Sequence, residues 1–121
     1  MVDLNLDEGI NHFNESEYFE AHDWFEEKWM DSKGEVQNFL QGLVQISVGS
    51  YHLTNKNYAG ALSQFTKASE KLEKYPNTYK KINLLQLRED INNIIKQISL
   101  FYSKKSFNFE IVKIPFIKIN T

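Results

Sequence analysis

Five polar residues could act together in this 121-residue chain. His22 and Glu26 are four residues apart in a stretch of helical periodicity, so their side chains lie one turn apart on one face. Gln41, Gln45 and His52 fall within about 40° of one another on a second expected helix, at 3.6 residues per turn. That second helix is apolar all round, which is typical of a buried helix. We therefore expect the five side chains to meet in the interior.

Three interpretations of these five residues are open. In the first, they form a buried polar network that fixes helix packing, because each unpaired buried polar group costs about 1–3 kcal/mol. In the second, His22, Glu26 and His52 bind a divalent metal such as Zn, Fe or Mn, and Glu26 is the general base of a hydrolase. In the third, the residues line a pocket for a small ligand or an anion. The residue types leave open whether the chain is an enzyme.

The elements that must position these residues are helices. Capping signals and apolar periodicity predict five of them, at residues 5–13, 16–30, 35–55, 58–74 and 83–103. The short connections at 31–34 and 55–57 make the middle three helices antiparallel neighbours. At a rise of 1.5 Å per residue, His22 then comes level with Gln41 to Gln45. We predict an all-α fold, a compact bundle of about five helices over residues 1–105.

Two C-terminal elements could bind a partner. The helix at 83–103 has an apolar seam that repeats at spacings of three and four, formed by Leu84, Leu87, Ile91, Ile94, Ile98 and Phe101. The seam packs either on the central helix of its own chain or on a second copy. Residues 106–121 are rich in β-branched and aromatic types and contain Pro115, so we expect an extended C-terminal arm. An exposed apolar arm promotes aggregation, so it should dock on its own bundle or on a partner.

Composition narrows the class of protein. The chain has no cysteine, which excludes disulfides and thiolate metal sites and fits a reducing compartment. It has no apolar run near 18 residues and no signal-peptide pattern, so no membrane association is expected. Net charge is −2 and we expect both signs to be interspersed, so nucleic-acid binding is not expected. We expect a cytoplasmic protein, or a plastid stromal one if the abundant Lys, Asn and Ile reflect a plastid genome.

Three stretches carry a resemblance to a known family. They are NESEYFEAHDWFEEKW at 14–29, FLQGLVQISVGSYHL at 39–53 and NYAGAL at 57–62. Together they resemble the domain-of-unknown-function 309 family, which is all-helical and carries H-E-x-x-E-x-x-W, Q-G-x-x-Q and G-N-x-x-G-A motifs. The resemblance covers residues 10–75 and places the motif positions at His22, Glu26, Trp29, Gln41, Gly42, Gln45, His52, Asn57, Gly60 and Ala61. Asp23 departs from the usual Glu, and Lys56 departs from a frequent Gly. The shorter Asp23 puts in doubt any role that needs a long carboxylate there, and the resemblance implies a fold more than an activity.

These observations lead to one functional expectation and one alternative. We expect a small non-catalytic helical domain that binds a protein partner or forms a homo-oligomer through Trp24, helix 83–103 or the C-terminal arm. The alternative is a metal-dependent hydrolase whose site contains His22, Glu26 and His52.

Overall fold

The computed structural model describes residues 4–104, 114 and 117–119. In this part of the chain the fold is all-α, as predicted, with one minimal hairpin between the last two helices. The elements in order are α1 (Asp7–Asn14), α2 (Tyr18–Met30), α3 (Gly34–Thr54), α4 (Tyr58–Leu72), β1 (Thr78–Tyr79), β2 (Ile82–Asn83) and α5 (Leu84–Lys104). No helix in the described residues is both long enough and apolar enough to cross a membrane.

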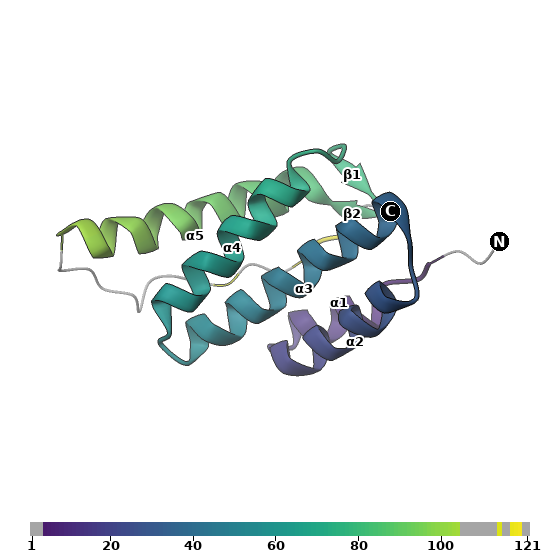
Figure 1. Ribbon diagram of the computed structural model, residues 1–121, viewed down its shortest axis with the longest axis horizontal. Coiled ribbons are helices and arrows are strands. Elements are labelled where there is room, and N and C mark those ends of the chain that lie inside the picture. The colour runs from purple at the N-terminus through teal and green to yellow at the C-terminus, as the bar shows by residue number, and fades with distance from the viewer. Residues whose placement is uncertain (1–3, 105–113, 115–116, 120–121) are drawn as a thin grey trace.

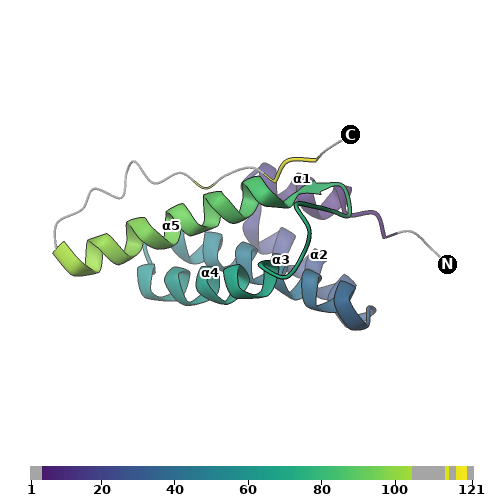
Figure 2. The ribbon, with the colours of Figure 1, turned by 90° about the horizontal axis from the view of Figure 1, so that it is seen from above.

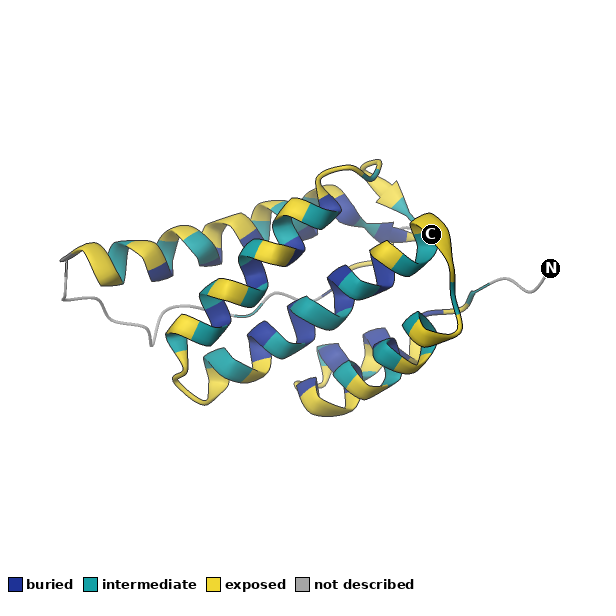
Figure 3. Ribbon diagram, in the orientation of Figure 1, coloured by how far each residue is buried: buried dark blue, intermediate teal, exposed yellow. Residues whose placement is uncertain are grey.

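The helices form two layers. Helices α2, α3 and α4 lie side by side in one layer, while α1 packs on α2 and α5 packs on α4 in the other (Figures 1 and 2). Short connections force the helices of the first layer to run antiparallel. The core lies between the layers, and its largest members include Phe13, Phe25, Phe39 and Phe65, all of them fully buried (Figure 3). The layer of α2, α3 and α4 therefore has a face that no other described helix covers (Figure 2).

Helix α3 is buried on one side only. Phe39, Leu43 and Ile46 are fully buried, whereas Gln41 and Gln45 on the other side are half-buried. The expectation that this helix is buried all round is therefore wrong. The other layer of helices covers one side of α3, and Gln41 and Gln45 lie on the side that this layer leaves open.

The apolar seam of α5 is used within the chain. Leu84, Leu87, Ile91, Ile94 and Ile98 are all buried. Phe101 is half-buried, and its ring centroid lies 5.5 Å from that of Tyr58 in α4. The helix packs mainly on α4 rather than on the central helix α3.

The described part of the C-terminal arm docks on its own bundle, one of the two expected outcomes. Ile117 is buried, and its backbone N–H and C=O both bond to the side chain of Asn14. The Asn83 N–H donates to the Lys118 carbonyl, and Ile119 forms an isolated bridge with Ile82. The rest of residues 106–121 lies outside the described residues.

Candidate functional site

One turn of α2 brings a histidine and two carboxylates together. His22 Nε2 lies 3.1 Å from Glu26 Oε2, and His22 Nδ1 lies 3.1 Å from Asp23 Oδ1. One ligand atom from each residue lies within 4.8 Å of the others. The expected pairing of His22 with Glu26 is thus present, and Asp23 joins it unexpectedly. The cluster therefore places one imidazole and two carboxylates on a single turn of α2.

The two glutamines of α3 do not join this cluster. Among the described residues, neither Gln41 nor Gln45 makes a side-chain hydrogen bond, and Gln45 Oε1 is buried without a partner. Such an oxygen costs about 1–3 kcal/mol relative to a bonded one. The glutamine stripe therefore has hydrogen-bonding capacity that the described chain leaves unused.

His52 belongs to the turn between α3 and α4. Its Nδ1 lies 3.4 Å from Asn57 Nδ2, and Asn57 Oδ1 accepts from the Gly60 N–H as the N-cap of α4. A Cβ on Gly60 would lie 2.6 Å from Asn57 Nδ2 and 3.0 Å from His52 Cδ2. These three residues therefore form a compact structural turn that requires glycine for close packing.

The five residues share a surface without forming one buried network. We call this surface the outer face: the side of the α2–α3–α4 layer turned away from α1 and α5, facing the viewer in Figure 1. In the described part of the chain, His22 bonds to carboxylates of its own helix and His52 bonds to Asn57. The predicted hydrogen-bonded unit of all five residues is therefore wrong, because its members face the open side of the layer. A ligand site on this face remains a prediction.

A comparison with known protein families gives a match that includes all five of these residues. Residues 6–64 match the family model of the domain of unknown function DUF309. This part of the chain is a DUF309 domain. The match runs from the start of α1 into α4, so it includes the His22 cluster, the glutamine stripe and the His52 turn. No curated protein matches the sequence.

An exposed aromatic pair lies at one end of the outer face of the DUF309 domain. Phe19 of α2 and Tyr51 of α3 are 54 % and 43 % exposed, and their ring centroids are 6.0 Å apart. Phe19 also lies 6.0 Å from the His22 ring. A shallow hollow of about 390 Å³ adjoins the pair, lined by Ser16, Tyr18, Phe19, Glu20, Tyr51, Thr54 and Asn55. Sequence reasoning missed this pair, although the neighbouring polar residues mark Phe19 as lying near the solvent side of α2.

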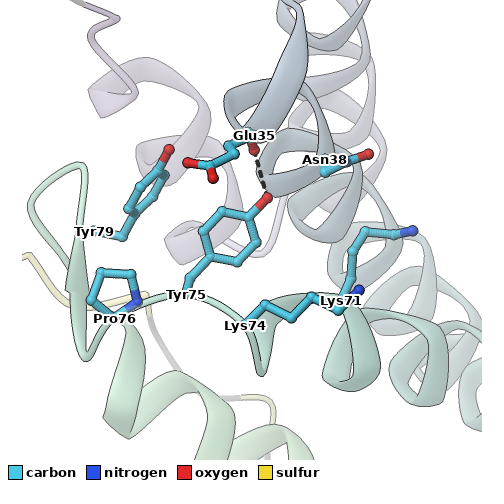
Figure 4. A pocket seen from close by; sticks show the side chains of 7 residues that line it. All are labelled: Glu35, Asn38, Lys71, Lys74, Tyr75, Pro76 and Tyr79. Atoms are coloured by element: carbon cyan, nitrogen blue, oxygen red, sulfur yellow. Dashed lines mark hydrogen bonds between the residues drawn. The ribbon is translucent and has the colours of Figure 1, made fainter.

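A second hollow, of about 320 Å³, lies at the other end of the layer (Figure 4). Tyr75 Oη donates to the Glu35 carbonyl at 2.5 Å, which ties the end of α4 to the start of α3. The pKa of Tyr79 is raised by burial and, to a smaller extent, by the charge of Glu35. The pKa of Tyr75 is raised by burial and then by the neighbouring Tyr79 and Glu35. Lys71 and Lys74 also line this hollow. Its tyrosines therefore stay neutral donors at ordinary pH.

Proposed function

We propose that this chain is a non-catalytic protein-interaction domain whose binding surface is the outer face. The exposed pair of Phe19 and Tyr51 carries the proposal, because rigid aromatic side chains that remain in solvent are enriched at interfaces. Of the partner surfaces expected from the sequence, the α5 seam and the described part of the arm are packed within the chain, and Trp24 is partly buried against the core. The outer face is a large helical surface that no other described helix covers (Figure 1).

Site-specific photo-cross-linking tests this proposal. A photo-reactive residue placed at Phe19 should give a discrete cross-linked product in cells, which mass spectrometry identifies. The same residue at Tyr102, 49 % exposed on α5, is the matched control and should not give that product. The identified chain, once purified, should bind the domain and lose at least about tenfold in affinity when Tyr51 becomes Ser, since tenfold is 1.4 kcal/mol. Equal, diffuse products from both positions would contradict the proposal.

A specific observation supports a second candidate function, divalent-cation binding by the α2 cluster. The ligand set differs from the expected one, because Asp23 takes the place assigned to His52. Imidazole and two carboxylates suit Zn²⁺ or Mn²⁺. The metal-dependent hydrolase would depend on this same cluster, with Glu26 either as a ligand or as the base.

Calorimetric titration with Zn²⁺ and Mn²⁺ separates this candidate from a simple ion pair. We expect saturable one-to-one binding that His22→Gln abolishes. His12→Gln is the matched control, because His12 lies 2.8 Å from Glu17 but has a single carboxylate partner. Equal loss in both variants, or no saturable heat at all, would rule the cation site out.

A further inference from the structure

The charges of this chain are sorted along the sequence. Residues 1–35 contain eleven acidic and two basic residues, a net charge of −9. Residues 36–121 contain five acidic and twelve basic residues, a net charge of +7, so the two parts give the −2 of the whole chain. The expectation of interspersed charge is therefore wrong, and the small net charge is the sum of two large and opposite charges.

The sorted charges are not neutralised within the described chain. Every ion pair among the described residues involves a histidine, so no lysine or arginine there pairs with a carboxylate. Lys67 and Lys71 follow one stripe of α4 at i and i+4, and Lys74 lies just past the end of the helix. The buried residues of α4, among them Phe65 and Leu72, lie on a different side of the helix. The outer face thus has a basic edge on α4.

The opposite edge of the outer face is acidic. Asp23 and Glu26 are 60 % and 44 % exposed on α2, next to Phe19. Helix α3 separates the two edges, and neighbouring helix axes are 8–10 Å apart, so α2 and α4 lie roughly 16–20 Å apart. Charges at that distance in one chain cannot form ion pairs.

The two edges are also in register along the helix axes. A Cβ on Gly42 of α3 would lie 2.9 Å from Leu72 Cδ2, which places the adjacent Lys71 near the level of Gly42. On the other flank, Gln37 Nε2 donates to the Trp29 carbonyl, and Phe19 contacts Tyr51. Glu26, between Phe19 and Trp29, therefore also comes near the level of Gly42.

We infer that the outer face binds a second copy of this chain about a two-fold axis parallel to α3. This inference rests on the proposed function of that face and names its partner. Rotation about such an axis exchanges the two edges while it keeps every residue at the same level. Glu26 of each copy then faces Lys71 of the other, and Asp23 faces Lys67. A two-fold axis perpendicular to the helices would instead place α2 against α2, acid against acid.

The centre of this arrangement accounts for the glutamine stripe. Because the axis follows α3, Gln41 and Gln45 of one copy meet those of the other. Each amide offers two donors and an acceptor, so the Gln41 amide and the Gln45 NH₂ group, which make no side-chain hydrogen bond in the described chain, can bond across the axis, while Gln45 Oε1 stays buried within its own copy. Interfaces of this isologous kind are the commonest in homo-oligomers.

The area of the outer face sets the expected affinity of the dimer. Three helices about 9 Å apart and about 22 Å long span roughly 600 Å² per copy, below the standard 800 Å². The dimer should therefore be weak, and because charge pairs at its edges hold it, salt should dissociate it.

Complementary charge reversals test the inference by sedimentation velocity on the full chain. The basic variant carries Asp23→Lys and Glu26→Lys, and the acidic variant carries Lys67→Glu and Lys71→Glu. The wild type should be dimeric at about 10 mM salt and monomeric at about 1 M. Each variant alone should be monomeric, whereas their equimolar mixture should form a one-to-one dimer. EDTA should leave the dimer unchanged, since no bridging metal is required.

Engineered cysteines test the geometry, and the chain has no native cysteine to interfere. Glu26→Cys with Lys71→Cys should oxidise to a covalent dimer, because a disulfide needs Cα atoms within about 7 Å, which α2 and α4 of one chain do not reach. Glu26→Cys with Glu73→Cys is the control and should stay monomeric.

Failure of this inference differs from failure of the proposed function. A wild type that stays monomeric at low salt, with a mixture that does not associate, overturns the dimer. If Phe19 then still cross-links to a different chain, the interaction face stands without it. If Phe19 gives no specific product either, both the dimer and the proposed interaction face are overturned.

Discussion

Replacing Phe65 with alanine is expected to lower the free energy of unfolding by about 3–5 kcal/mol. The ring is fully buried where α4 crosses α3, and a Cβ on Gly49 would lie 3.1 Å from its Cδ1 and Cε1. The total free energy of unfolding of a domain of this size is about 5–15 kcal/mol, so the melting temperature should fall by roughly 10–25 °C. Urea denaturation measures the change as a shift in midpoint.

Leu85→Ala is the matched control for this prediction. Leu85 is 44 % exposed at the start of α5, so its truncation should change stability by no more than about 0.5 kcal/mol. A comparable loss in both variants would mean that the packing at the α3–α4 crossing is not the source of the effect.

A double-mutant cycle locates the contact. Gly49→Ala in the wild type presses a methyl group against the Phe65 ring, and such overpacking costs about 1–3 kcal/mol. In the Phe65→Ala background the ring is gone, so the same change should stabilise the chain by up to about 1 kcal/mol through helix propensity. Additive effects would show that the two residues do not touch.

Helix positions could be predicted because they depend on local signals. Apolar periodicity placed all five helices to within two residues at each end, and the buried side of α4 and α5 followed from the same period. The hairpin at Thr78–Asn83 was missed, because its turn places Lys80 and Lys81 at φ of 51° and 68°. Lysine has no special preference for that left-handed backbone, so the sequence carried no signal.

The candidate site was predictable only where it is local. His22 and Glu26 meet because residues four apart lie about one helical turn apart, and this spacing can be read from the sequence. The burial of Gln41, Gln45 and His52 depended on which neighbours surround α3, and a helical wheel does not contain that information. Val44 and Val48 lie on the open side and are half-buried, and their apolar type led to the prediction that the helix is apolar all round. The polar stripe was in fact the signal for the open side.

Asn14→Ala is expected to release the described part of the C-terminal arm and to lower the free energy of unfolding by about 2–3 kcal/mol. One amide side chain bridges residues 103 positions apart: its Nδ2 donates to the Ile117 carbonyl at 3.0 Å, and its Oδ1 accepts from the Ile117 N–H at 2.8 Å. Ile117 is 2 % exposed, so truncation leaves both backbone groups without partners next to the core. Each such group costs about 1–3 kcal/mol when it stays buried, so the arm instead opens to water.

Hydrogen exchange at the Ile117 amide distinguishes a local clasp from a general loss of stability. Asn11→Ala changes an exposed residue of the same helix whose side chain makes no hydrogen bond in the described structure, so Ile117 protection should stay as in the wild type. Asn14→Asp keeps the acceptor for the Ile117 N–H but turns an oxygen toward the Ile117 carbonyl, so it should fall between the two. Equal protection in Asn11→Ala and Asn14→Ala would show that the bridge from Asn83 to Lys118, at 2.8 Å, suffices to hold the arm. If the predicted order is found, the end of α1 ties the described part of the arm to the bundle, away from the outer face.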